Sequence, residues 1–79
     1  MYEMQRRQAQ IEEFRRKIEQ AKRTNDRDIV RHLVSQMSTS GLIPYSIVPF
    51  INLVIFVSPG AALNMLSSSF EASARRMLR

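Results

Sequence analysis

The longest window without a charged residue most constrains what this chain can fold into. The window covers residues 32–70 and contains no Asp, Glu, Lys or Arg, whereas both flanks are strongly charged. Inside it, the apolar stretch at residues 42–66 is long enough to cross a bilayer, because a membrane-spanning helix needs about 20 mostly apolar residues. We therefore interpret residues 42–66 as a transmembrane segment.

A buried helix of a small soluble domain is the alternative interpretation of this stretch. Pro44, Pro49 and Pro59 are unusual in one continuous helix and favour that alternative. In water, however, such a stretch needs other elements to cover it on every side, and a chain of 79 residues has little to offer beyond a charged helix. In a membrane, neighbouring helices and local adjustments accommodate prolines. We favour the membrane interpretation.

Composition limits the chemistry and leaves the partner open. The formal net charge of +5 suits nucleic acid, anionic lipid headgroups or an acidic protein surface, and charge alone does not choose among these. The chain has no cysteine, which excludes disulfides, thiolate catalysis and cysteine-based metal sites.

Residues 1–24 are expected to form a charged helix with a partial heptad seam. They contain no Pro or Gly, and acid–base pairs four positions apart, such as Glu12 with Arg16, favour a helix. Apolar residues alternate at spacings of three and four, which is typical of a helix that packs against one partner helix. A solvent-exposed helix with a narrow apolar stripe is the equal alternative. The seam consists of Met4, Ile11, Phe14 and Ile18.

Residues 25–41 are expected to form a second, amphipathic helix and a hinge. Asn25 is the expected N-cap, because it follows a break in the first pattern and precedes Asp28 by three positions. Such a helix would lie on a membrane surface or on a neighbouring protein. We interpret His32, the one histidine, as a polar residue beside the apolar side rather than as a ligand or a base. That apolar side comprises Ile29, Val30, Leu33, Val34 and Met37.

Within residues 42–66 the prolines predict a kinked helix. Pro44 fits the first turn, Pro49 is expected to kink or break the helix, and Pro59 with Gly60 is expected to end or bend it. Asn52 is expected to hydrogen-bond another helix or a freed carbonyl. The residues expected to pack within the membrane or against other helices are Pro44, Pro49, Phe50, Asn52, Pro59, Asn64 and Phe70.

Residues 67–79 are expected to form a short basic amphipathic helix. Ser68 precedes Glu71 by three positions, which is the spacing of a capping box. We interpret the three adjacent serines as a cap and a turn, because neither a base nor an oxyanion motif accompanies them. The residues expected to reach lipid headgroups or a partner surface are Arg31, Arg75, Arg76 and Arg79.

Two motifs in the central stretch resemble a known family. VPF at residues 48–50 is followed, after the apolar residues 51–63, by NMLSSSFE at residues 64–71. They resemble the transmembrane signature of the LETM family, the leucine-zipper and EF-hand-containing transmembrane proteins of the mitochondrial inner membrane, in which V-P-F and N-M-L-P-S-T-F-E flank an apolar run. LIPY at residues 42–45 resembles the family's earlier L-V-P-F. The resemblance covers residues 42–71 and implies a mitochondrial inner-membrane segment.

Departures from the family pattern bear on activity. Asn52 stands where the family has an acidic residue that is linked to cation transport, and Ser67 replaces the proline of N-M-L-P. The chain also contains no EF-hand loop. The resemblance therefore implies a location more firmly than an activity.

Together these patterns predict an all-α membrane protein: a charged N-terminal helix, a second amphipathic helix, one kinked transmembrane helix and a short C-terminal amphipathic helix. We expect a small structural accessory subunit of a respiratory complex or the ATP synthase, and neither an enzyme nor a cofactor-binding or metal-binding protein. The expected partners are other membrane subunits in a hetero-oligomeric complex and the bilayer, with cardiolipin as a candidate lipid; nucleic acid is not expected. The alternatives are cation or proton transport by an oligomer and a membrane tether for the mitochondrial ribosome. Membrane orientation stays open, because basic residues flank the stretch almost equally.

Overall fold

The computed structural model describes residues 2–77, with the side chains of all of these except residues 2 and 4, and this part of the chain is almost entirely helical. It contains four α-helices and one 3-10 turn and no strand, so the all-α prediction is confirmed for the described residues. The elements are α1 (Tyr2–Thr24), α2 (Arg27–Thr39), η1 (Tyr45–Ile47), α3 (Val48–Val57) and α4 (Pro59–Met77).

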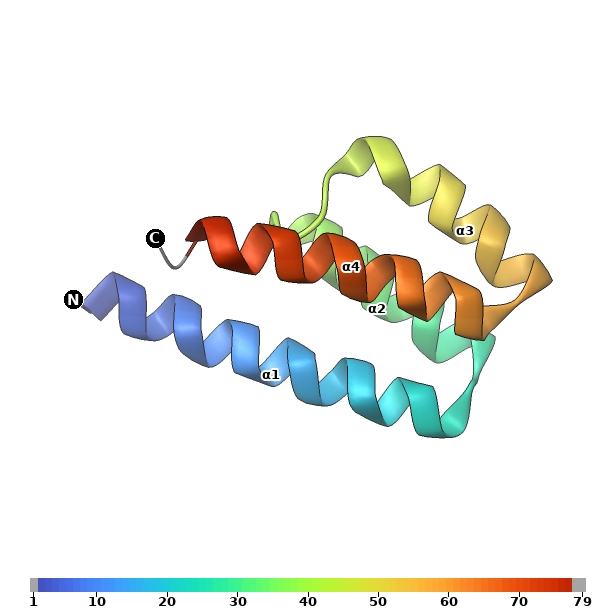
Figure 1. The fold of residues 1–79 in the computed structure, drawn as a ribbon, viewed down its shortest axis with the longest axis horizontal. Helices are drawn as coiled ribbons and strands as arrows, with labels where there is room; N and C mark the ends of the chain where they lie inside the picture. The colour runs from blue at the N-terminus through green and yellow to red at the C-terminus, as the bar shows by residue number, and fades with distance from the viewer. Residues whose placement is uncertain (1, 78–79) are drawn as a thin grey trace.

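The helices form a small bundle in which successive helices run in opposite directions (Figure 1). The bundle measures 41 × 26 × 17 Å along its principal axes. Helices α2 and α4 each contact the other three helices and together form the middle of the bundle. The beginning of α1 and the end of α4 lie at the same end of the bundle (Figure 1).

A single apolar core joins all four helices. Helix α4 contributes a stripe at spacings of three and four, which is the period of one helix face. Each of the other helices turns one apolar face toward this stripe. The buried apolar side chains are Ile11, Phe14, Ile18, Ala21, Val30, Leu33, Val34, Met37, Leu42, Ile43, Ile51, Ile55, Ala62, Leu63, Leu66, Phe70 and Ala74.

The heptad seam of α1 packs inside the chain. Ile11, Phe14 and Ile18 are buried in the core, and α1 contacts α4 and α2. The seam thus has its partner helices within the same chain, and the alternative of a solvent-exposed helix is wrong for this stretch. The side chain of Met4 lies outside the described residues.

The expectation of one kinked helix over residues 42–66 needs correction. The stretch is divided between η1, the ten-residue α3 and the first turns of α4, and its inward residues join the core. Pro49 is compatible with α3 because it lies in the first turn, where no intrahelical N–H bond is lost. Among the residues that the structure describes, no helix combines the length and the apolar character needed to cross a membrane.

Helix α3 ends at Val57, which agrees with the helix end expected at Pro59 and Gly60, and Pro59 also begins the next helix. Ser58 has an extended backbone, and its hydroxyl oxygen accepts a hydrogen bond from the Ala61 N–H at 3.3 Å, so it acts as the N-cap of α4. Pro59 occupies the first helical position, where proline is favoured. The expected capping box at Ser68 and Glu71 is wrong, because α4 continues through it to keep Leu66 and Phe70 on the buried face.

The turn between α1 and α2 also differs in detail from the prediction. Asp26, rather than Asn25, is the N-cap of α2, and its carboxylate accepts the Asp28 N–H at 2.8 Å. Asn25 has a positive φ of 52°, a conformation that Asn tolerates better than most residues. The N-cap of α2 therefore lies one residue later than the sequence pattern indicates.

Candidate functional site

The side of α3 that faces away from the bundle is apolar and uncovered. Among the described side chains, six large hydrophobic ones are exposed, and five of them belong to η1 and α3. Phe56 is 75% exposed and Val57 is 77% exposed. We call this surface the outer face of α3; it consists of Tyr45, Phe50, Leu53, Phe56 and Val57.

The composition of α3 explains this face. Ile51 and Ile55 lie four positions apart, point into the core and fix the rotation of the helix. Because almost every other residue of α3 is also apolar, the opposite side cannot be polar. Exposed apolar side chains grouped in this way are typical of surfaces that contact a membrane or another protein.

Two arginines of α2 border α3 on one side. The Nε of Arg27 donates a hydrogen bond to the carbonyl oxygen of Ile55 at 3.3 Å, which places its guanidinium group against α3. Arg31 lies one helical turn further along α2, and its Nη1 is 3.7 Å from an oxygen of Asp28. Both side chains of this last pair are largely exposed, so the ion pair is weak.

A pocket of about 400 Å³ lies between α2 and α3, beside the outer face of α3. Arg31 lines it from α2, while Tyr45 and Asn52 line it from the other side. The Oδ1 of Asn52 is buried and has no hydrogen-bond partner among the described residues. The expectation that Asn52 bonds another helix or a freed carbonyl is thus wrong for its oxygen. The complete lining is Arg31, Val34, Ser35, Ser38, Thr39, Tyr45, Val48 and Asn52.

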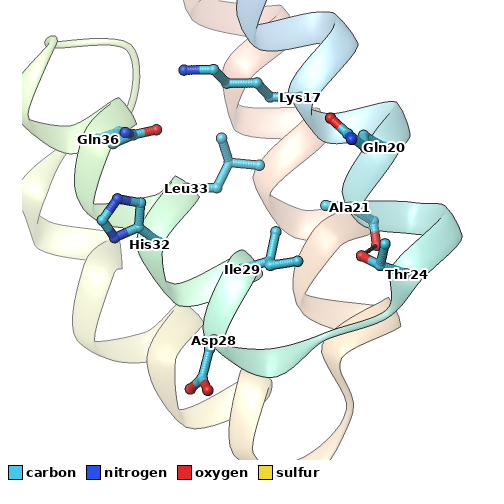
Figure 2. A pocket seen from close by; sticks show the side chains of 9 residues that line it. All are labelled: Lys17, Gln20, Ala21, Thr24, Asp28, Ile29, His32, Leu33 and Gln36. Atoms are coloured by element: carbon cyan, nitrogen blue, oxygen red, sulfur yellow. Dashed lines mark hydrogen bonds between the residues drawn. The ribbon is translucent and has the colours of Figure 1, made fainter.

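A second hollow, of about 570 Å³, lies between α1 and α2 (Figure 2). Figure 2 shows Ile29 and Leu33 of α2 in its middle, with Lys17 toward one end and Asp28 at the other. This α1–α2 groove therefore has an apolar floor and opposite charges at its two ends, which suits an amphipathic helix. Its lining residues are Lys17, Gln20, Ala21, Thr24, Asp28, Ile29, His32, Leu33 and Gln36.

The residues predicted to form a packing or headgroup site fall in several places. Asn64 and Pro49 are exposed, and Phe70 is a fully buried core residue. Arg75 and Arg76 are exposed in the last turn of α4, and Arg76 shares a surface pocket with Pro44 and Tyr45. Arg79 lies outside the described residues. Of the predicted residues, Pro49, Phe50 and Asn52 thus belong to α3 itself, and Arg31 of α2 lies beside it.

Sequence reasoning missed Arg27 and assigned no site role to Ile29. Arg27 and Arg31 lie four positions apart and so share one face of α2, but no local pattern shows that α3 lies beside that face. Within residues 2–77 no three His, Asp or Glu side chains gather as a metal site would require.

Comparisons of the chain with protein-family models, with curated proteins and with solved structures gave no match. The resemblance to the LETM family therefore rests on the motifs at residues 42–71.

Proposed function

We propose that this chain is a small structural accessory subunit of a membrane-bound assembly, held at the bilayer surface by the outer face of α3. The observation that carries the proposal is the concentration of exposed apolar side chains on η1 and α3. A helix in the plane of a membrane interface buries apolar side chains while cationic groups beside them meet the headgroups; here α3 would supply the apolar side chains, and Arg27 and Arg31 of α2 the cations.

The energetics of insertion support this orientation. Burying a Leu or Phe side chain stabilises the bound state by about 1.5–3 kcal/mol, and Phe50, Leu53 and Phe56 are all available without unfolding the bundle. Arg27, Arg31 and Arg76 lie beside α3 and η1, where they would meet anionic headgroups. The bundle would then rest on the surface with α3 against the lipid.

The α1–α2 groove supplies the contact with the host assembly in this proposal. Its occupant would be one amphipathic helix of the host, with its apolar side on Ile29 and Leu33. Charge complementarity sets its direction, since an acidic residue of the host would lie near Lys17 and a basic one near Asp28.

The location in the proposal comes from the resemblance of residues 42–71 to the LETM family, which points to the mitochondrial inner membrane and to a respiratory complex or the ATP synthase as host. The resemblance concerns the same stretch that forms η1, α3 and the first part of α4. In this chain we assign that stretch to the membrane surface rather than to a span.

Vesicle flotation tests the membrane contact. The wild-type chain is expected to float with vesicles of phosphatidylcholine and phosphatidylglycerol, and the double variant Leu53→Ser/Phe56→Ser is expected to stay at the bottom of the gradient. Ile29→Ser is the matched control, because it removes an exposed apolar side chain from a different surface. Circular dichroism confirms that all three chains are helical. Equal flotation of the wild type and the double variant would contradict the proposal, as would a wild type that does not float.

A further inference from the structure

We infer that the pocket between α2 and α3 binds the headgroup of an anionic phospholipid, with the phosphate on Arg31 and the acyl chains along the outer face of α3. This inference rests on the proposed membrane contact and names the lipid that the contact selects. The headgroup we assign carries a hydroxyl beside its phosphate, as in phosphatidylglycerol.

Arg31 is the phosphate-binding group of this pocket. A guanidinium group offers several N–H donors in a planar arrangement that matches phosphate oxygens. Its acidic neighbour in α2, Asp28, is 91% exposed and 3.7 Å away, so a phosphate can replace it at little cost. Tyr45 lines the same pocket, and we assign its hydroxyl as a second donor.

The hydroxyls of Ser38 and Thr39 do not add donors for the phosphate. Both donate to the carbonyl oxygen of Ser35, each at 2.9 Å. The phosphate is therefore expected on the Arg31 and Tyr45 side of the pocket.

Asn52 explains why the headgroup needs a hydroxyl. Its Oδ1 is a buried acceptor without a partner, and an unsatisfied buried acceptor costs about 1–3 kcal/mol. No water-sized group reaches this oxygen as the side chain lies, so the Asn52 amide must turn toward the pocket; a headgroup hydroxyl that then donates to it would recover that free energy. A choline headgroup has no N–H or O–H donor and cannot do so.

The position of the pocket beside α3 determines where the acyl chains of the lipid would lie. Asn52 and Phe56 lie one helical turn apart, so the pocket borders the outer face directly. A lipid with its phosphate at Arg31 would lay its chains over Phe56 and Leu53. Arg27, held on the Ile55 carbonyl, adds a second cation along the same edge.

The test compares Arg31→Gln with Arg16→Gln. Both variants remove one exposed arginine, but Arg16 lies on α1 and lines a different surface pocket. Partition is measured into vesicles of phosphatidylcholine alone and into vesicles that also contain phosphatidylglycerol. Arg31→Gln is expected to lose roughly tenfold in the preference for phosphatidylglycerol, about 1.4 kcal/mol, and Arg16→Gln is expected to lose little. Equal losses in the two variants would show non-specific attraction and overturn the inference.

A charge-neutral variant tests the pocket itself. Ser35→Phe places a bulky side chain at the pocket from an exposed position of α2, and it is expected to remove the preference for phosphatidylglycerol while binding to phosphatidylcholine persists. An unchanged preference in this variant would overturn the inference.

Two further outcomes distinguish a failure of the headgroup site from a failure of the membrane contact. If Leu53→Ser/Phe56→Ser loses binding to both kinds of vesicle while Arg31→Gln behaves as wild type, the membrane contact stands and the headgroup site fails. Glycerol 1-phosphate is expected not to compete with vesicles, because it lacks the chains. Competition by this soluble compound, lost in Arg31→Gln, would show that the pocket takes a free phosphate and would overturn the lipid assignment.

Discussion

Arg15 of α1 and Glu71 of α4 form a two-point ion pair that joins the N-terminal helix to the C-terminal one. The Nε of Arg15 donates to Oε2 of Glu71 at 3.1 Å, and its Nη2 donates to Oε1 at 2.9 Å. The hydrogen bonds from Arg15, followed by the charges of Arg15 and Arg75, lower the pKa of Glu71 against the opposing effect of burial. The pair lies more than 50 positions apart in sequence and fixes the register of α1 on α4.

Glu71→Gln is expected to destabilise the bundle only where Glu71 is ionised. Because the folded state lowers this pKa, the stabilising contribution is fully present above the unfolded value of 4.5 and is lost as pH falls through the lower folded value. The side chains are about two-fifths exposed, so the loss at neutral pH should be about 0.5 kcal/mol. Urea unfolding at neutral and acidic pH measures it, with Glu13→Gln as the surface control. A difference between wild type and Glu71→Gln that grows on acidification would contradict this account.

Truncation of two phenylalanines in the charge-free window should have very different effects on stability. Phe70 is completely buried in α4, so Phe70→Ala should cost about 3–5 kcal/mol of unfolding free energy. Phe56 lies on the outer face of α3, and Phe56→Ala should change stability by no more than about 0.5 kcal/mol. Thermal and urea unfolding in water measure both. Similar costs for the two variants would show that α3 and α4 are not arranged as described.

Asp26→Ala tests the boundary between α1 and α2. The variant removes the carboxylate that accepts the Asp28 N–H, and it should destabilise the bundle by about 1 kcal/mol. Asn25→Gly is the companion variant, because glycine adopts the positive φ of this position without strain. It should leave stability unchanged or raise it slightly. If Asn25→Gly proved the more damaging change, Asn25 would be the N-cap after all.

Under the proposed function, Ile29→Glu is expected to detach the chain from the host assembly without releasing it from lipid. Ile29 lies in the middle of the α1–α2 groove, and a carboxylate there would oppose an apolar helix face. Native gel separation of mild-detergent extracts should show the wild type co-migrating with a respiratory complex or the ATP synthase and the variant migrating alone. Co-migration of Ile29→Glu at wild-type level would exclude the groove as the contact.

The helical class and the first half of the fold could be predicted from sequence. Charge pairs and seam spacing indicated α1, and the break at Thr24 with a following acid indicated the start of α2. These signals are local, because they depend on residues within one or two turns of each other. The N-cap was missed by one residue, since Asn25 and Asp26 are both good caps and only the backbone distinguishes them.

The second half required knowledge of the tertiary structure. Ser58 followed by Pro59 is itself a local signal for a helix start, with an N-cap and a proline at the first helical position. The interpretation of residues 42–66 as one span left this signal unused. The interpretation of residues 42–66 as a span depends on the expectation that a chain of this size cannot cover them in water. That expectation was wrong for the inward side, because α2 and α4 pack against α3, where Ile51 and Ile55 are buried. The outer face of α3 is the part that stays uncovered.

The most direct test of the membrane contact measures the depth of a nitroxide label on α3. The chain contains no cysteine, so Leu53→Cys and, as control, Gln10→Cys on exposed α1 can each be labelled at a single site. On adding vesicles, the label at position 53 should become more accessible to oxygen and less accessible to a water-soluble nickel complex, while the label at position 10 should stay in water. A label at position 53 that remains fully accessible to the nickel complex would contradict the docking of α3 on the bilayer.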